Sequence, residues 1–304
     1  MIRFLDHQDI DKGKWDQCIR QAPNGNVYAF SWYLDRVCKN WKALVKNDYE
    51  TVFPLTHGKK YGIQYLYQPY FAQQLGVFSK GKINSSTVEQ FLDIISARYK
   101  FFEIVLNVSN PVDLSKFEKN KNRTFELDLA GPYDDICNQY SENTKRNVTK
   151  ALKNQIIIKK ESNIEELIGL FRNNLGKKIK KIKTIHYNNL RSVMIEGLNR
   201  KLGEVYAAYG TNGKYCAGAY FLFSMDSFVF LFSASSPESR ENGAMFLIID
   251  NFIKAKAGSN YLIDFQGSNI ESLARFYRGF GSKPMEYLSI RQNKLPWPVR
   301  VLKR

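Results

Sequence analysis

The sequence predicts a mixed α+β protein of two domains, each built from a mixed, mostly antiparallel sheet that is flanked by helices. Isoleucine- and aromatic-rich runs alternate with segments of helical period along the whole chain. The two halves also share one order of elements: helices, an antiparallel meander, a helix, a strand and a final strand. Between the halves, Ala130-Gly131-Pro132 interrupts this order, because a Gly-Pro pair favours turns. We therefore expect domains at 1–130 and 131–304.

The first half carries strand-like runs separated by amphipathic segments. Ser31 is expected to cap the second helix, since a serine side chain can accept from the first free N–H groups. In chain order, we expect a strand at 2–5, helices at 9–21 and 31–38, strands at 41–45, 51–56 and 61–67, a helix at 85–99, and strands at 101–108 and 123–129.

The second half begins with helices and then becomes richer in strands. Its elements follow from the same change between helical period and short apolar runs. In chain order, we expect a helix at 143–154, a strand at 156–160, helices at 164–174 and 187–201, strands at 203–209, 215–225 and 228–233, a helix at 244–257, a strand at 261–265, a helix at 272–277 and a strand at 285–290.

The composition is that of a globular protein that buries a core, with 44% hydrophobic and 24% charged residues among 304. No run approaches the roughly 18 apolar residues of a membrane-spanning helix, and Asp6 interrupts the N-terminus before a signal-peptide core could form. The four cysteines are scattered without CxxC spacing, which favours a reducing compartment. We therefore expect a cytoplasmic protein without a transmembrane segment, which leaves peripheral membrane contact open.

The formal net charge of +16 predicts an anionic partner. A surplus of this size raises the local concentration of polyanions and speeds their capture. Nucleic acid, anionic lipid, a nucleotide cofactor and a phosphorylated substrate all satisfy it, and charge alone does not choose among them. The sequence does not indicate an oligomeric state.

The first motif is the segment 228–250, a strand that ends in a loop of small residues before a long helix. Gly243 stands at the expected helix start, where free N–H groups and the helix dipole suit an anion. Ser233, Gly243 and Ala244 are therefore candidate donor- or phosphate-binding residues. The same spacing also fits an ordinary strand-to-helix connection, since one glycine is weak evidence.

The second motif is the segment 261–281. Asp264 and Gln266 share one face of a short apolar strand, because strand side chains alternate. A carboxylate on a buried strand must be hydrogen-bonded or protonated, so Asp264 either pins a neighbouring loop or takes part in proton transfer. Arg275 and Arg278 share a helix face that suits phosphate or carboxylate, although simple exposure explains them equally well.

The third motif is the basic helix at 143–154. Lys145, Arg146, Lys150 and Lys153 lie along it, and no acidic residue follows until Glu161. Exposed helices usually mix both signs, so a face of one sign favours an anionic partner. A further lysine cluster at 177–183 is expected to be a solvated loop.

Three segments occur in a defined order: YSENTKRNVTKALKN (140–154), FLFSASSPESRENGAMFLIIDNFIKAKAGSNYLIDFQGS (230–268) and ARFYRGFG (274–281). This order resembles the Fem-type aminoacyltransferases, which build peptidoglycan interpeptide bridges, and their GNAT-like (acyl-CoA N-acyltransferase) relatives. The first half adds QPYFAQQLGVF (68–78), similar to a segment of that group, and Gln73 within it is a candidate substrate contact. The resemblance implies two tandem GNAT-like domains, with the donor site in the second.

The resemblance also implies roles for residues outside the strand end. Lys145 stands where the family usually has arginine and Asn147 matches a family asparagine, so with Arg146 they would contact phosphates of the donor or acceptor. Arg240 and Gly243 match the R/Q-x-x-G start of a coenzyme-A loop, with Met245 where a small residue is expected.

The end of the second motif is similar to the family's Phe-Lys-x-x-Phe-Gly pattern, in which Phe276, Phe280 and Gly281 match. Tyr277 occupies the lysine position. Lysine would place a fixed positive charge beside a developing oxyanion, whereas tyrosine is neutral at pH 7 but can donate a proton. Tyr277 is therefore the candidate general acid or oxyanion donor, Asp264 is the second catalytic candidate, and Gln266, Phe276 and Arg278 are candidate substrate contacts.

These inferences predict an N-acyltransferase that moves an acyl or aminoacyl group from an activated donor to an amine on a small molecule, sugar or peptide. The expected donor is acetyl-CoA or another acyl-CoA. The mechanism needs no metal, and His7, His57 and His186 lack metal-ligand spacing. The alternatives are an aminoacyl-tRNA-dependent transferase of peptidoglycan bridge synthesis, and a non-enzymatic protein that binds nucleic acid or an anionic surface.

Overall fold

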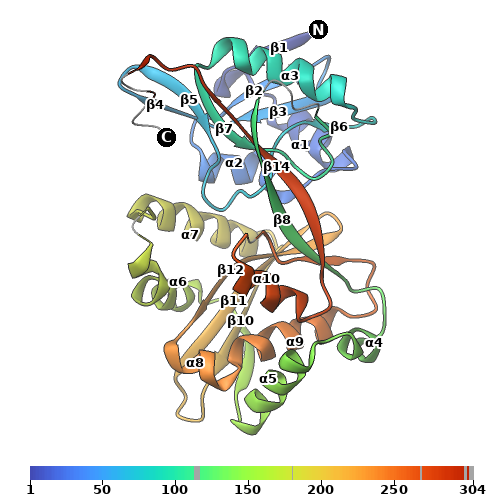
Figure 1. Cartoon of the computed structure of the whole chain (residues 1–304), viewed down its shortest axis with the longest axis vertical. Coiled ribbons are helices and arrows are strands. Elements are labelled where there is room, and N and C mark those ends of the chain that lie inside the picture. The colour runs from blue at the N-terminus through green and yellow to red at the C-terminus, as the bar shows by residue number, and fades with distance from the viewer. Residues whose placement is uncertain (113–116, 180, 268, 298–299, 301–304) are drawn as a thin grey trace. The chain divides into compact units, whose positions relative to one another are not determined.

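The computed structural model describes residues 1–112, 117–179, 181–267, 269–297 and 300 (Figure 1). The chain forms two compact units, Met1–Asn122 with Glu286–Arg304, and Arg123–Met285. The unit boundaries fall inside two long strands, β8 (Glu118–Asp128) and β14 (Lys283–Asn293). They therefore differ from the Gly-Pro boundary that divides the predicted domains 1–130 and 131–304, and those domains stay a prediction.

The first unit contains two sets of strands. One is a sheet of order β1-β2-β3-β6, and in the other β4, β5, β7 and β14 are neighbours in that order. The C-terminal part of β14 returns to this unit because it pairs with β7, from Ser289↔Val105 to Asn293↔Phe101. The bounds are β1 (Ile2–Leu5), β2 (Lys42–Lys46), β3 (Thr51–Leu55), β4 (His57–Lys60), β5 (Ile63–Tyr67), β6 (Phe78–Ser79) and β7 (Phe101–Val105), with helices α1 (Lys12–Gln21), α2 (Ser31–Val37) and α3 (Ser85–Arg98).

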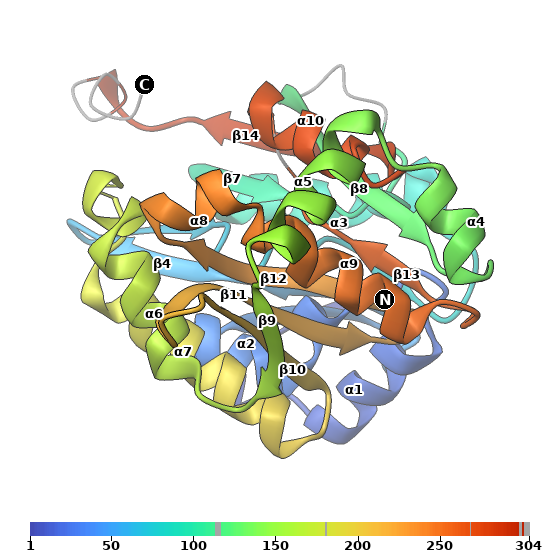
Figure 2. The same cartoon turned by 90° about the horizontal axis from the view of Figure 1, so that it is seen from below.

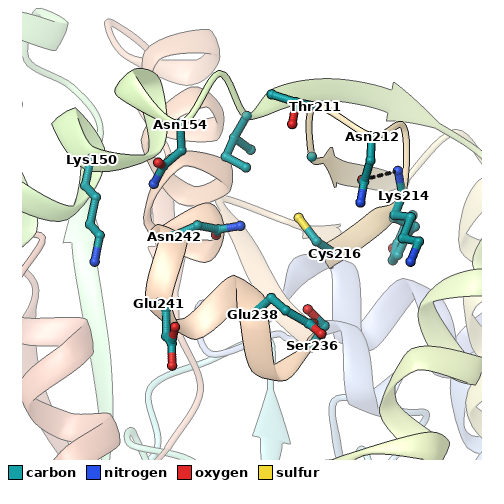
Figure 3. Close-up of a pocket in the computed structure, with 13 residues that line it drawn as sticks. Lys150, Asn154, Thr211, Asn212, Lys214, Cys216, Ser236, Glu238, Glu241 and Asn242 are labelled. Atoms are coloured by element: carbon teal, nitrogen blue, oxygen red, sulfur yellow. Dashed lines mark hydrogen bonds between the residues drawn. The ribbon is translucent and has the colours of Figure 1, made fainter.

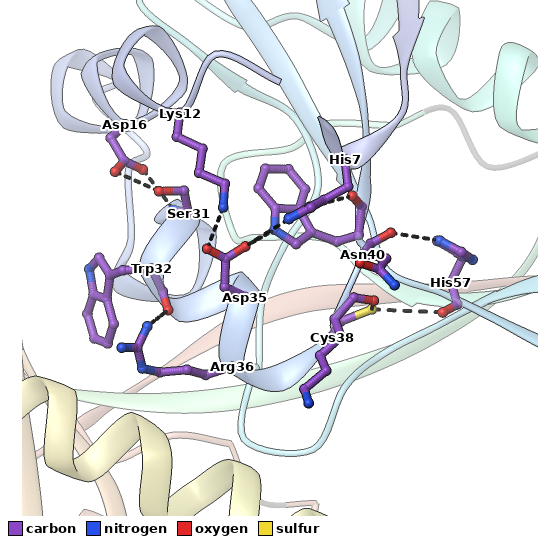
Figure 4. Close-up of polar contacts among 12 residues, drawn as sticks. His7, Lys12, Asp16, Ser31, Trp32, Asp35, Arg36, Cys38, Asn40 and His57 are labelled. Atoms are coloured by element: carbon purple, nitrogen blue, oxygen red, sulfur yellow. Dashed lines mark hydrogen bonds and ion pairs between the residues drawn. The ribbon is translucent and has the colours of Figure 1, made fainter. Parts of the chain in front are cut away.

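Helix α2 begins differently from the prediction. Ser31 is its first residue rather than its N-cap, which is Phe30. The Ser31 N–H donates to Asp16 Oδ1 over 2.7 Å, and the Ser31 hydroxyl donates to Asp16 Oδ2 over 2.8 Å (Figure 4). The expected Ser31 cap is therefore wrong, because a carboxylate from α1, distant in sequence, satisfies the start of α2 instead.

Replacing Asp16 by alanine is expected to destabilise the first unit by about 2 kcal/mol. The change removes two hydrogen bonds to a charged acceptor and leaves the Ser31 N–H without its partner at a helix start. Urea denaturation of Asp16→Ala should show a lower midpoint, and the exposed Asp9→Ala should serve as a near-neutral control. Equal midpoints for the two variants would contradict this role of Asp16.

The second unit has one sheet whose strands follow the order β8-β13-β12-β11-β10-β9. Its strands are β9 (Ile157–Glu161), β10 (Gly203–Tyr209), β11 (Tyr215–Ser224), β12 (Ser227–Ser235) and β13 (Leu262–Asp264), together with β8. Its helices are α4 (Tyr133–Asn138), α5 (Glu142–Lys153), α6 (Ile164–Asn173), α7 (Thr184–Asn199), α8 (Pro237–Asn242), α9 (Ala244–Lys256) and α10 (Glu271–Arg278). The loop of small residues that is expected before Gly243 instead contains α8, which Ser236 caps and Pro237 opens.

Helices cover both faces of this sheet (Figure 2). Phe221 of β11 stacks on Phe252 of α9 at 3.6 Å between ring centroids, whereas the next residue back, Tyr220, donates its hydroxyl to the Met194 carbonyl of α7. Because neighbouring strand residues point to opposite faces, α9 and α7 lie on opposite sides. Among the described residues, no helix combines the length and the apolar character that a membrane span needs.

The sheet opens beside β12. β13 pairs in parallel with β12 over three positions, from Ser227↔Leu262 to Val229↔Asp264, and then ends. β12 continues to Ser235 alongside β11, with an irregularity in register opposite Tyr220 and Phe221. Beyond Val229, no strand of the described residues pairs with the edge of β12 that faced β13, and this opening positions the site described next.

Candidate functional site

A cavity of about 550 Å³ lies along β12 beyond Val229, between side chains of α6, α8, α9 and α10. We call it the splay cavity. Phe171 of α6 lines it from one side of the sheet. Tyr277 of α10 lines it from the other side, where it belongs to the core cluster that includes α9. Its wall is largely apolar, with a few polar groups. The full lining is Phe171, Asn174, Leu175, Phe230, Ser233, Ala234, Ser235, Ser239, Arg240, Met245, Phe246, Ile270, Ser272, Leu273, Phe276 and Tyr277.

Tyr277 forms part of the inner wall. Its ring stacks on Phe265 at 5.1 Å and also contacts Phe125 and Phe230. Burial, together with the negative charge of Asp264, raises the pKa of Tyr277 to about 12. The phenol therefore keeps its proton at neutral pH and can donate it to a group that becomes negative in the cavity.

Asp264 closes β13 and holds the turn that follows. Its Oδ1 accepts from the hydroxyl of Thr124 and from the Gln266 N–H, the latter over 2.8 Å. Burial raises the pKa of the Asp264 carboxyl, and these two hydrogen bonds oppose the rise. Asp264 thus pins the neighbouring loop, as one of the two interpretations predicted, while its part in proton transfer stays a prediction.

Two predicted donor-binding residues, Ser233 and Arg240, line the splay cavity. Arg240 also borders an adjoining hollow of about 300 Å³, which we call the basic recess. Lys177 and Lys178 line the recess as well, so part of the predicted lysine loop lies beside the cavity mouth. Lys180 lies outside the described residues. An apolar cavity with a cationic margin suits a ligand that joins an apolar group to an anionic one.

Gly243 lies between α8 and α9 with a φ of +78°. A Cβ at this position would meet the Asn147 carbonyl oxygen of α5 at 2.4 Å, so α5 fills the space beside Gly243. The Ala244 N–H donates to Asn242 Oδ1 over 3.0 Å, and Ala244 is buried. Both residues therefore have packing roles in this structure, and phosphate binding at Gly243 and Ala244 stays a prediction.

The basic helix α5 does not supply side chains to the splay cavity. Lys145 pairs with Glu142 over 3.5 Å, and Arg146 donates to Asn143 Oδ1 over 3.1 Å. Asn147 donates to the Asn143 carbonyl over 2.8 Å. The structure thus keeps these three predicted phosphate contacts together on one helix and outside the splay cavity, and their ligand remains a prediction.

A second cavity, of about 570 Å³, lies between the end of α5, the turn from β10 to β11, and α8 (Figure 3). Lys150 and Lys214 line it, but so do Glu238 and Glu241, so its formal charges balance. Burial raises the pKa of the Cys216 thiol at its wall, which keeps that thiol protonated. This cavity does not contain Tyr277, and its groups do not indicate acyl transfer.

The predicted substrate contacts separate into different places. Phe276 lines the splay cavity and packs edge-on against Phe246 at 4.7 Å. Arg278 instead pairs with Glu271 and lies over the Phe125 ring. Gln73 belongs to the first unit, where its Nε2 donates to the Tyr287 hydroxyl over 3.1 Å.

Gln266, the fourth predicted substrate contact, follows the end of β13. Its φ is +61°, in the left-handed region. Its side-chain Nε2 is buried and, within the described part of the chain, has no hydrogen-bond partner. Because an unpaired buried donor costs free energy, this amide is suited to a ligand acceptor.

Glu126 is a residue that the sequence analysis missed. It lies on β8 directly across from Asp264 of β13. Burial and the negative charges of Asp264 and Asp226 raise the pKa of Glu126 to about 7. A glutamate between Phe125 and Leu127 of a predicted strand was the available sequence signal, but the register that places it beside Asp264 is a tertiary property.

No protein-family model matches the chain, and no curated protein matches it. Solved structures do. The chain is similar to FemX, with a TM-score of 0.64 and 12% identity over 96% of this chain and 98% of that one. It is similar to L-PGS from Bacillus licheniformis, with a TM-score of 0.57 and 10% identity over 96% of each chain. It is also similar to the C-terminal domain (DUF2156) of a putative lysylphosphatidylglycerol synthetase from Agrobacterium fabrum. That structure has a TM-score of 0.57 and 9% identity, over 96% of this chain and 94% of that one.

These likenesses confirm the predicted fold class. The chain has the fold of FemX and of these two lysylphosphatidylglycerol-synthetase-type structures. The order and spacing of the three motifs therefore indicated the right architecture. At sequence identities of 9–12%, these similarities establish the fold of the chain and not its activity.

Proposed function

We propose that this protein is an N-acyltransferase that moves an acyl or aminoacyl group from an activated, anionic donor to the amine of a small molecule, sugar or peptide. The observation that carries the proposal is the splay cavity, which lies along β12 and has Tyr277 in its wall. The donor that we propose is an acyl-CoA, and the protein is proposed to act in the cytoplasm.

The shape of the splay cavity supports this proposal. Because β13 ends at Asp264, the edge of β12 beyond Val229 faces the cavity and offers backbone groups to a donor that carries amides. Phe230, Phe246 and Phe276 supply apolar contacts for the acyl part. Lys177, Lys178 and Arg240 supply positive charge for phosphate at the basic recess.

Tyr277 supports a transfer reaction at this place. When an amine attacks a thioester or ester carbonyl, the C–N bond forms, the bond to the leaving group breaks, and negative charge develops on the departing sulfur or oxygen. A protonated phenol in the wall can give its proton to that atom. The pKa of about 12 keeps the proton available at neutral pH.

A thermal-shift screen tests the donor. We expect acetyl-CoA or a longer acyl-CoA to raise the melting temperature, since a ligand that binds only the folded state stabilises it by mass action. The shift should be larger for the parent protein than for Arg240→Ala, which removes a charge shared by the cavity and the recess. Lys82→Ala, an exposed lysine of the first unit, is the control.

The screen also separates the alternatives. A shift with charged tRNA but with no acyl-CoA would favour the aminoacyl-tRNA-dependent transferase. RNA binding that weakens steeply with salt, without transfer from any donor, would favour a nucleic-acid-binding protein. Either result would contradict an acyl-CoA donor, and the second would contradict the enzyme.

A further inference from the structure

The interior of the splay cavity is formed mainly by large apolar side chains. They come from four elements: Phe171 of α6, Phe230 of β12, Met245 and Phe246 of α9, and Phe276 of α10. The rings of Phe246 and Phe276 pack edge-on at 4.7 Å between their centroids, so each holds the other in place. A wall of this kind binds a ligand by removing apolar surface from water.

Two polar side chains of the wall are engaged with the backbone of their own helices. Asn174 Nδ2 donates to the Leu170 carbonyl of α6 over 2.8 Å. Ser239 Oγ donates to the carbonyl of Ser236, the N-cap of α8, over 2.9 Å. These bonds take up hydrogen-bonding capacity that a polar ligand would need, so the wall is better suited to a hydrocarbon group than to a polar one.

The charge that borders the cavity is positive. Arg240 belongs to the lining, and no acidic residue is among the described residues that line the cavity. The basic recess adds Lys177 and Lys178, again without an acidic side chain in the part of its lining that the structure describes. An aminoacyl group carries an ammonium ion, which needs a carboxylate partner when it leaves water. These surroundings therefore favour an uncharged acyl group that is joined to an anionic remainder.

Three exposed apolar side chains also line the cavity. Leu175, Ile270 and Leu273 have exposed fractions of 43%, 62% and 41%. A volume of about 550 Å³ lies in the range that holds a whole drug-sized ligand, so an acetyl group would fill only a small part of it. A longer hydrocarbon chain would fill more of the cavity and would also cover the exposed side chains, which is favourable because apolar surface leaves water.

We propose that the splay cavity binds a medium- or long-chain fatty acyl group, so that the donor is a fatty acyl thioester whose phosphate groups lie at the basic recess. This proposal rests on the proposed function and narrows its donor, because it gives a fatty acyl group precedence over acetyl and aminoacyl groups. Arg240 lines both the cavity and the recess, and it therefore lies where the apolar and anionic parts of such a donor join.

The transfer itself balances with these components. The lone pair of a neutral amine forms the C–N bond at the thioester carbonyl, and the C–S bond breaks. The electron pair leaves with the sulfur, which receives the Tyr277 proton. The amine nitrogen loses one proton to water, and Tyr277 is reprotonated from water. The products are an N-acyl amide and free coenzyme A, and no oxidant, reductant or metal takes part.

Isothermal titration calorimetry of the whole chain with acetyl-CoA, hexanoyl-CoA and decanoyl-CoA tests the proposal. Each methylene group that becomes fully buried should tighten binding about fourfold. Since part of the chain lies at the exposed side chains, we expect decanoyl-CoA to bind about 100-fold or more tightly than acetyl-CoA. Release of free coenzyme A, with ethanolamine and glucosamine as probe acceptors, reports transfer. Decanoate is a further probe, because a free fatty acid also joins a chain to an anion, and we expect it to bind more weakly than decanoyl-CoA.

Substitutions locate the chain. Leu273→Asp places a carboxylate among the exposed apolar side chains, and we expect the ratio of decanoyl-CoA to acetyl-CoA affinity to fall about tenfold or more. Ile195→Asp is the matched control, because Ile195 of α7 is 45% exposed and does not line the cavity. Ala234→Leu takes space from the cavity wall and should shift the preference from decanoyl-CoA toward hexanoyl-CoA.

Each outcome supports or overturns the proposal. Equal affinities for acetyl-CoA and decanoyl-CoA, together with acyl transfer, would overturn the fatty acyl group and leave the proposed function standing. The same affinity ratio in Leu273→Asp and Ile195→Asp would show that the chain does not bind in the splay cavity. Decanoate that binds as tightly as decanoyl-CoA would assign the cavity to a free fatty acid rather than a thioester. If the parent protein binds no CoA ester and transfers no acyl group, the proposed function fails and this proposal fails with it.

Discussion

Replacing Tyr277 by phenylalanine is expected to lower kcat about 100-fold or more, with little change in donor affinity. The substitution removes one oxygen from the wall of the splay cavity and keeps the ring that stacks on Phe265. A positioned proton donor contributes on the order of 10²–10⁴ in rate, because it stabilises charge that appears only in the transition state. Steady-state kinetics with the donor from the thermal-shift screen should show the loss in kcat rather than in KM.

Tyr206→Phe is the matched control for this prediction. Tyr206 belongs to the same core cluster, and burial likewise raises its pKa to about 12, but its side chain does not line the splay cavity. Both variants keep an aromatic ring, so a general weakening of the core would affect them alike. Similar activities for Tyr277→Phe and the parent would remove Tyr277 from the mechanism, although the cavity would remain a binding site.

Replacing Gly243 by alanine is expected to destabilise the second unit by about 3 kcal/mol. An alanine at a φ of +78° costs about 1–2 kcal/mol in left-handed backbone strain. Its methyl group would also lie 2.4 Å from the Asn147 carbonyl oxygen, so α5 must move, which costs about 1–3 kcal/mol more. For a unit of this size, thermal melting should shift down by roughly 6–12 °C.

Gly258→Ala separates the two costs. Gly258 has the same φ of +78°, but a Cβ there would meet nothing within 4 Å. Its variant should therefore show the backbone cost alone, a smaller loss than that of Gly243→Ala. If the two variants melted at the same temperature, close packing of α5 against Gly243 would not be the reason for glycine at this position.

The candidate site was only partly predictable. Tyr277, Phe276, Arg240 and Ser233 do meet in one cavity, as the order of the motifs led us to expect. The predicted phosphate contacts on the basic helix α5 do not line this cavity. The close packing of α5 against α9 at Gly243 sets the orientation of α5. Charge and spacing describe which residues share a helix face, but they do not say what that face meets.

Glu126 and Ser31 show the same limit in two ways. Burial raises the pKa of Glu126, and the charge of Asp264, which lies far along the chain and is brought beside it only by strand pairing, raises it further. Ser31 looked like a cap by its position, yet the acceptor at the start of α2 is Asp16 of another helix. Local sequence rules name the groups that can accept from a helix N-terminus or shift the pKa of a carboxyl. Which of these groups does so depends on tertiary contacts.

By itself, the sequence determined the fold class and most of the helices and strands, because hydrophobic period and turn residues act over a few neighbouring positions. It also pointed to Tyr277, through one departure from an otherwise matched motif. Only the tertiary structure decided where β13 stops beside β12, which side chains line the resulting cavity, and that Glu126 faces Asp264. Those features depend on strand register and helix packing between distant segments, which no local pattern encodes.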